Sequence, residues 1–180
     1  MHTNLARDMA SYNEWMNRRL YSACAELSDE DRRKDRGAFF KSIHGTLNHL
    51  LLGDRIWLGR FTGIPFQADS LDQELYHDFT ELRKERETTD REILQWAGTL
   101  TDQILAGTLR YTSMVNPAPR ESEMWLAVAH FFNHQTHHRG QLTVMLSQCG
   151  KDYGVTDLMW LPQVVERNKK QSNHGGHGDH

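Results

Sequence analysis

The chain is poor in cysteine and has no long apolar run, and each shortage excludes a class of protein. Only two cysteines occur among the 180 residues, Cys24 and Cys149, and they do not form a Cys-x-x-Cys pair. We expect two reduced thiols that pack as small apolar side chains, not a disulfide framework. No stretch approaches the roughly 18 apolar residues that cross a bilayer. Because the first residues are also too polar for a secretory signal, the sequence predicts a cytoplasmic protein with no membrane partner.

The chain also has no excess of basic residues over acidic ones. The chain carries 21 Lys and Arg against 24 Asp and Glu, which gives a formal net charge of −3. General nucleic-acid binders present a strongly basic surface to phosphate, so we expect no nucleic-acid partner. The sequence also lacks a P-loop, a glycine-rich phosphate-binding motif and the turn that exposes a nucleophilic serine.

Apolar spacing is the main structural signal that is present. Large apolar residues recur every three or four positions in four long segments, which is the period of a helix with one buried face. Ser28 and Asp31 resemble a capping pair and predict a short helical turn between the first two segments. The four long helices are expected near residues 4–26, 38–60, 72–98 and 121–148.

Two further segments depart from this spacing. Residues 104–120 are rich in Thr, Tyr and Val and end in prolines, which predicts short extended pieces before the last long helix. The polar, glycine-rich end of the chain predicts a disordered His/Gly-rich tail over residues 167–180. No internal repeat or domain boundary is visible, so we expect one all-α domain, a four-helix bundle, over residues 1–166.

Histidine is abundant, with eleven in the chain, and four of them crowd into the last predicted helix. At roughly 100° per residue, His138 lies about 40° and His134 about 80° from the centre of the apolar stripe. His130 and His137 lie more than about 100° away from it. The pair His134 and His138 therefore points inward, one turn apart, as two imidazoles that share a zinc or nickel ion do.

The second predicted helix offers further ligands, because it carries His44, His49 and Asp54. Gly45 and Gly53 lie four residues before and after His49 and would leave room for a metal ion and its water. The spacing alone does not select His49, since Asp54 lies nearest the apolar stripe. A buried aspartate at this position would bond to an arginine or histidine beside the site, or would bind the metal directly.

Several stretches resemble the DinB family, part of a DinB/YfiT-like superfamily of metalloenzymes. The run NHQTHHRGQL is similar to the His-xxx-His-Arg-Gly-Gln run on the last long helix of that family. The opening, second-helix and closing stretches are similar too: MASYNEWMNRRLYSACAEL, GAFFKSIHGTLNHLLLGDRIWLGRF and YGVTDLMWLP. The resemblance extends to about Glu166. It implies an up-down-down-up four-helix bundle that is often dimeric and holds one divalent metal through three histidines.

The resemblance also implies which residues hold that metal. His134 and His138 match the last-helix pair, in agreement with the helical spacing. The third ligand falls on His49, with His44 as the alternative if the alignment shifts. Gln141 is expected to cap or orient a neighbouring side chain. We expect metal affinity to fall as the pH drops through about 6 to 6.5, where free imidazoles take up protons.

Three histidines with an open coordination position are typical of a catalytic zinc site. Such a metal would activate water for hydrolysis, with Asp54 as the candidate general base, or would present a low-molecular-weight thiol to an electrophile. The wider superfamily includes thiol transferases, and this analogy makes the thiol route attractive. We therefore expect a metal-dependent enzyme of the thiol S-transferase or hydrolase type. The competing interpretation is a non-catalytic, damage-inducible stress-response protein that binds metal. Aromatic residues on the first and third helices, together with the resemblance, predict a homodimer.

Overall fold

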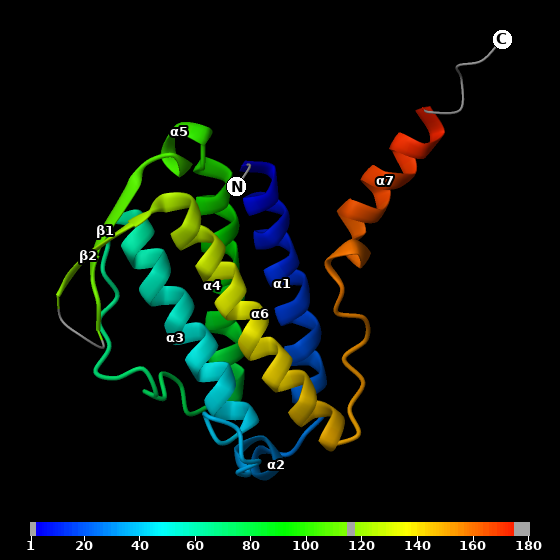
Figure 1. Cartoon of the computed structure of the whole chain (residues 1–180). Helices are drawn as coiled ribbons and strands as arrows, with labels where there is room; N and C mark the ends of the chain where they lie inside the picture. Colours follow the sequence, from blue (N-terminus) through cyan, green and yellow to red (C-terminus); the bar gives the residue numbers. More distant parts are fainter. Residues whose placement is uncertain (1–2, 115–117, 175–180) are drawn as a thin grey trace.

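The computed structural model describes residues 3–114 and 118–174, and four long helices that lie side by side form its framework (Figure 1). Each of α1 and α3 packs against both α4 and α6. In Figure 1, α1 and α6 run downward whereas α3 and α4 run upward. The predicted all-α class is confirmed. The four helices are α1 (Thr3–Ala25), α3 (Ile43–Thr62), α4 (Phe79–Thr99) and α6 (Met124–Gln148).

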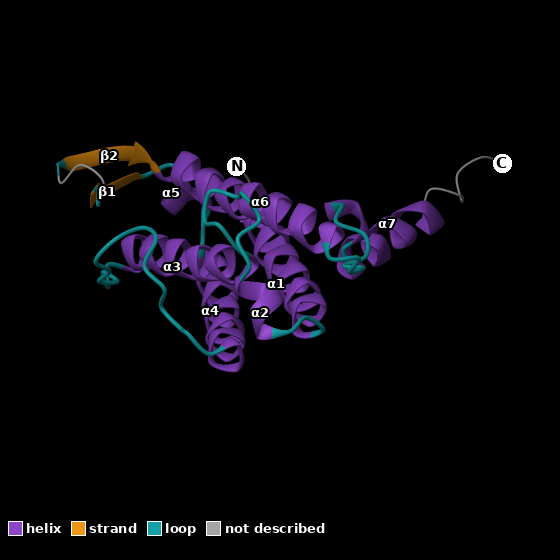
Figure 2. Cartoon of the chain, turned by 90° about the horizontal axis from the view of Figure 1, so that it is seen from below, coloured by secondary structure: helices purple, strands orange, loops and turns teal. Residues whose placement is uncertain are grey.

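A β-hairpin occupies the segment that was predicted to be extended. It consists of β1 (Thr108–Thr112) and β2 (Pro119–Glu123), follows the short helix α5 (Asp102–Leu105), and projects from one side of the bundle (Figure 2). The strands are antiparallel. Because β2 extends to Glu123, α6 begins at Met124 and not near residue 121 as predicted.

The second long helix starts later than its apolar spacing suggests. Ala38 and Lys41 form an antiparallel backbone bridge, and Lys41 has a φ of 63°, so the predicted first turn of the helix is not helical. Instead the Ser42 hydroxyl accepts a 3.0 Å hydrogen bond from the Gly45 N–H and caps α3. The resulting turn before α3 brings Phe40 back over the helix.

The third long helix also starts later than predicted. Asp78 caps α4 by accepting a 2.9 Å hydrogen bond from the Glu81 N–H, so residues 72–78 belong to the connection that precedes the helix. This connection is fastened to α3 by Asn48, whose Oδ1 accepts from the Tyr76 N–H at 2.9 Å and whose Nδ2 donates to the Tyr76 carbonyl at 3.1 Å.

The C-terminal region is more ordered than the composition suggests. After η1 (Leu158–Trp160), helix α7 runs over Pro162–His174, with a proline at its first position, where the missing N–H costs nothing. Arg167 pairs with Asp8 of α1 at 2.7 Å. Residues 167–174, expected in a disordered tail, are thus helical, whereas residues 175–180 lie outside the described ranges.

The interior contains two apolar clusters separated by a layer of buried polar side chains. Met16 and Leu142 belong to one cluster, and Ile93 and Phe131 belong to the other. No helix of the described ranges is both long enough and apolar enough to cross a membrane. The polar layer consists of Asn13, Asn17, Asp54, Arg86, Asp90, Gln135 and Arg139, each at most 4% exposed.

Candidate metal centre

Three histidines from two helices converge between α3 and α6. Nε2 of His49 lies 3.3 Å from Nε2 of His134 and 3.2 Å from Nε2 of His138. The possible ligand atoms of the three side chains all lie within 4.8 Å of one another, and the described part of the chain contains no second group of this kind. The structure therefore brings together the three histidines that the sequence and the resemblance nominate, in a group that could hold a metal ion.

Hydrogen bonds to the outer ring nitrogens fix the protonation of two of these imidazoles. His49 Nδ1 lies 2.8 Å from the Leu71 carbonyl oxygen, and His138 Nδ1 lies 2.9 Å from Oε1 of Gln141. Both partners are acceptors, so each Nδ1 carries the ring proton and each Nε2 keeps a lone pair. The 3.2 Å contact between His49 and His138 thus joins two lone pairs. Such a contact is repulsive unless a cation lies between the nitrogens.

The spacing of the nitrogens fits such a cation. Zinc–nitrogen bonds of about 2.0 to 2.1 Å in a tetrahedral site place two ligand nitrogens about 3.3 Å apart. The two separations measured from His49, 3.2 and 3.3 Å, agree with this value. A backbone carbonyl and a side-chain amide oxygen are also the kinds of partner that orient a metal-binding imidazole. Gln141 has the orienting role that was expected, whereas the Leu71 carbonyl was not foreseen.

Burial keeps the three imidazoles neutral. It lowers the pKa of His49 to about 4 and the pKa of His134 to about 3, and the neighbouring imidazoles add to the effect on His134. Burial lowers the pKa of His138 as well. The neutral ring is the form that binds a metal, so the site is prepared for binding at neutral pH.

These lowered pKa values revise the expected pH dependence of metal binding. Protons compete with the metal only when the pH approaches the pKa of the folded, metal-free site, so neutral rings persist into mild acid. We expect the apparent Kd for Zn²⁺ to change little between about pH 7 and about pH 5.5, and to rise as the pH falls through about 4, where His49 takes up a proton. Competition with a chromophoric chelator measures it. A midpoint near about 6.5, the value of a free imidazole, would contradict the effect of burial.

The other histidines of these two helices lie outside the group. Nε2 of His44 lies 3.0 Å from the Tyr76 carbonyl oxygen and 3.2 Å from Nη2 of Arg33, and it faces the connection before α4. His130 and His137 are exposed on α6. The division of the α6 histidines into inward and outward pairs is as the helical spacing predicted.

Two glycines of α3 allow close approach to the site. A Cβ on Gly53 would lie 3.0 Å from Cε1 of His134, so this glycine makes room for the imidazole ring itself. A Cβ on Gly45 would lie 2.3 Å from the Phe40 carbonyl oxygen. The Phe40 ring stacks on the His49 ring with centroids 3.7 Å apart. Phe40 thus covers one face of the site, a contact that no sequence pattern indicated.

Gly53→Ala is expected to weaken metal binding by roughly tenfold, because the added methyl group displaces the His134 ring from its position. Gly98→Ala on α4 is the matched control, since a Cβ there meets no atom within 4 Å. The control should leave the metal affinity unchanged and raise the free energy of unfolding by up to about 1 kcal/mol. Isothermal titration with Zn²⁺ compares the variants, and equal affinities would show that Gly53 does not set the position of His134.

Asp54 lies in the buried polar layer and outside the histidine group. Its Oδ2 accepts a 2.6 Å hydrogen bond from Arg86, and its Oδ1 accepts a 2.9 Å hydrogen bond from Gln135. Burial raises the pKa of Asp54, against the opposing charge of Arg86. With both oxygens engaged, Asp54 fits the expected buried aspartate bonded to an arginine. Because Gln135 follows His134 in sequence, the hydrogen bond ties α3 to α6 beside the site.

The two cysteines are free thiols, as expected. Cys24 is buried, and burial raises the pKa of its thiol to about 12. Cys149 is half-buried near the end of α6. A thiol with the pKa of Cys24 stays protonated at neutral pH and is a poor nucleophile.

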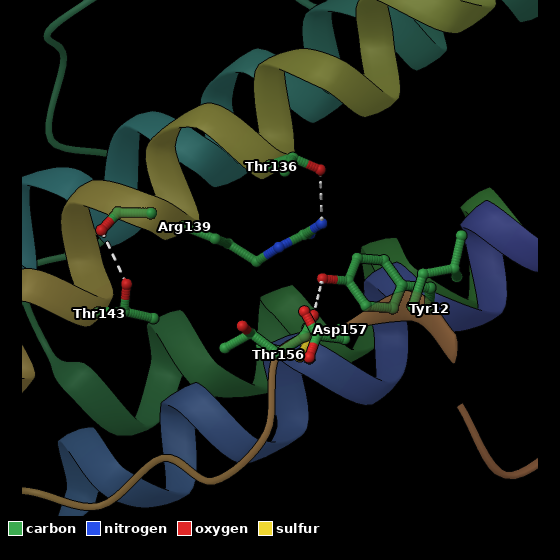
Figure 3. A pocket seen from close by; sticks show the side chains of 9 residues that line it. Tyr12, Thr136, Arg139, Thr143, Thr156 and Asp157 are labelled. Atoms are coloured by element: carbon green, nitrogen blue, oxygen red, sulfur yellow. Dashed lines mark hydrogen bonds between the residues drawn. The ribbon is translucent and has the colours of Figure 1, made fainter. Parts of the chain in front are cut away.

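A separate cavity of about 340 Å³ lies between α6, α1 and residues 156–158 (Figure 3). Arg139 extends into it and donates hydrogen bonds to Asn13 and, at 3.4 Å, to the Thr136 hydroxyl. No histidine of the metal group lines this cavity. The Arg139 charge lies near the buried carboxylates of the polar layer, so the cavity does not offer an uncompensated charge to a ligand.

Comparisons with known proteins indicate the family and the fold of the chain. The chain is 26% identical over 163 residues to Protein DinB of Bacillus subtilis (strain 168), over 86% of this chain and 92% of that protein. Its fold is similar to the crystal structure of a DinB-like protein from Bacillus cereus ATCC 10987, with a TM-score of 0.55, 18% identity, and coverage of 78% of this chain and 89% of that one. Since the DinB family pattern matches residues 1–170, the chain belongs to the DinB family.

Proposed function

We propose that the chain binds one divalent metal ion, zinc or nickel, through Nε2 of His49, His134 and His138, and that it is a metal-dependent enzyme. The observation that carries the proposal is the pair of facing lone pairs on His49 and His138, 3.2 Å apart. Three protein ligands leave at least one position for water or substrate, which is the composition of a catalytic site and not of a closed structural one.

The bound metal would lower the pKa of a water or thiol ligand and so supply a nucleophile near neutral pH. The protein's own residues orient the site: the Leu71 carbonyl and Gln141 hold two of the rings, and Phe40 excludes water from one face of His49. No carboxylate of the described ranges joins the histidine group, and Asp54 is fully engaged elsewhere. This supports transfer of a low-molecular-weight thiol over a hydrolysis that needs a carboxylate base.

Turnover by the metal-loaded protein tests the proposal. Zinc-loaded and nickel-loaded chains are incubated with low-molecular-weight thiols and a chromogenic electrophile, and separately with activated esters. We expect an S-conjugate from the unaltered chain and from His137→Ala, and none from His134→Ala. Ester hydrolysis without conjugation would select the hydrolase. Full metal loading without any turnover would instead support a non-catalytic metal-binding stress-response protein.

We also propose that the chain forms a homodimer. Exposed large apolar side chains lie mainly on α6 and the segment after it, whereas α1 and α4, the helices that the sequence suggested, contribute only Leu5. Such side chains are typical of an interface between copies. Sedimentation that shows only a 21.0 kDa species at micromolar concentration would contradict the dimer. The residues concerned are Trp125, Leu126, Val144, Val155, Met159 and Trp160.

A further inference from the structure

A line of side chains leads from the three histidines toward the β-hairpin along the facing sides of α3 and α6. The residues of each helix are spaced by three or four, so consecutive members of the line lie close together along the helix. The ring centroids of His134 and His130 lie 6.1 Å apart, and those of His130 and Trp57 lie 4.9 Å apart. The line consists of His49, Gly53, Trp57 and Arg60 on α3 and of His138, His134 and His130 on α6.

Arg60 stands at the far end of this line, between two aromatic rings. Its Cζ lies 4.4 Å from the centre of the Trp57 ring and 4.6 Å from the centre of the Tyr111 ring on β1. Contact with two rings stabilises the positive charge and restricts the orientation of the planar guanidinium. Arg60 also borders a cavity of about 250 Å³ between the end of α3 and the hairpin.

Nearby arginines have acidic partners, whereas no acidic partner of Arg60 is found among the described residues. Arg55 pairs with Glu85 at 2.5 Å, and Arg110 pairs with Glu121 at 2.6 Å. Within the described ranges, Arg60 forms no ion pair and no hydrogen bond to a protein acceptor, although it is half-buried.

The positive charge of Arg60 affects the neighbouring histidine, His130. Burial and the positive charge of Arg60 both lower the pKa of His130. The position of Arg60 in the last turn of α3 explains why a cation is tolerated there, since helix carbonyls favour positive charge. It does not explain a guanidinium that is held in one orientation and donates no hydrogen bond to any described residue.

We propose that Arg60 binds a carboxylate of the substrate whose reacting group lies at the three histidines, so that the substrate class is a carboxylic acid. The planar fork of a guanidinium matches the two oxygens of a carboxylate. The substrate chain would lie along His130 and Trp57, which separate the two ends. This inference rests on the proposed metal site and assigns Arg60 the selection of substrate.

The test uses the Co²⁺-substituted full chain and two series of probes. Mercaptocarboxylic acids of increasing chain length are compared with mercaptoalcohols of the same lengths. Binding is followed by the sulfur-to-cobalt charge-transfer absorption and by calorimetry. We expect the acids to bind roughly tenfold to hundredfold more tightly than the alcohols, with a maximum at one chain length, because the distance to Arg60 is fixed.

Three variants identify the residue responsible for the preference. Arg60→Gln should retain the cobalt spectrum and lose the preference for acids, whereas Arg60→Lys should retain only part of it, because an ammonium lacks the planar fork. Arg110→Gln is the matched control, since Arg110 borders the same cavity but already pairs with Glu121. It should keep the full preference, and thermal melting of each variant verifies that it is folded.

The experiment distinguishes failure of the proposed metal site from failure of the proposed role of Arg60. Absence of a cobalt spectrum that depends on His134 would overturn the metal site and this inference with it. A normal spectrum with equal binding of acids and alcohols would overturn the role of Arg60 alone. The same conclusion would follow if Arg60→Gln kept the preference for acids. It would also follow if the preference were equal at all chain lengths, because the acids would then be attracted by the overall electrostatic field of the protein and not by one residue.

Discussion

Replacing His134 or His138 by alanine is expected to lower the affinity for Zn²⁺ by more than roughly 100-fold. Loss of an outer hydrogen-bond partner of a metal ligand already costs about 10- to 100-fold, and here a ligand itself is removed. His49→Ala should have an effect of similar size, although its imidazole comes from the other helix. Metal content after identical purification and dialysis measures the effect.

His137→Ala is the matched control, because this imidazole is exposed on the same helix, next to His138 in sequence. It should keep a full complement of metal. All variants are compared in a chain that lacks residues 175–180, so that the histidines of that segment do not contribute to the measured metal content. If His137→Ala loses the metal while His138→Ala keeps it, the histidine group described between α3 and α6 is not the binding site.

Arg86→Met is expected to lower the free energy of unfolding by about 3 to 5 kcal/mol. Arg86 forms ion pairs with Asp54 at 2.6 Å and with Asp90 at 2.9 Å, and all three side chains are buried. The variant removes the ion-pair partner of two buried carboxylates and leaves them only the more distant positive charge of Arg139. Urea denaturation measures the loss, with Arg83→Met as the control for an exposed pair on the same helix. The control should cost less than about 1 kcal/mol.

The pH dependence of this loss separates electrostatics from packing. In the intact protein, burial raises the pKa of Asp90 to about 6 although Arg86 opposes the shift. Without Arg86 the carboxylates take up protons more readily, and protonation removes the buried charge. The cost of Arg86→Met should therefore be smaller at pH 5 than at pH 7. A cost that does not vary with pH would assign the effect to lost packing of a large side chain.

Periodicity located the long helices but not where two of them begin. The first helix was predicted over residues 4–26 and occupies Thr3–Ala25. The prediction is accurate because the apolar stripe of this helix extends to both of its ends. Ser42 and Asp78 begin α3 and α4 later than predicted, since hydrogen bonds from their side chains to the backbone select the first turn. The spacing of apolar residues gives no information on these hydrogen bonds between side chain and backbone.

The residues of the candidate site differ in how far the sequence predicted them. Helical spacing alone oriented His134 and His138, because both lie on one helix. His49 required the resemblance, since spacing on its helix does not select it. Phe40 and the Leu71 carbonyl were not predictable: a ring in a turn follows no period, and a backbone oxygen is present at every residue.

The parallel direction of α3 and α4 has a consequence for the chemistry of His49. Two helices that run the same way cannot be joined by a tight turn, so the chain must return along the bundle through residues 63–78 before α4 begins. This connecting segment contains Leu71, whose carbonyl oxygen accepts a hydrogen bond from Nδ1 of His49 and so keeps the ring proton on that nitrogen. An antiparallel pair joined by a short loop would leave this ring free to exchange tautomers. The order of the helices thereby determines which nitrogen of His49 is available to bind a metal.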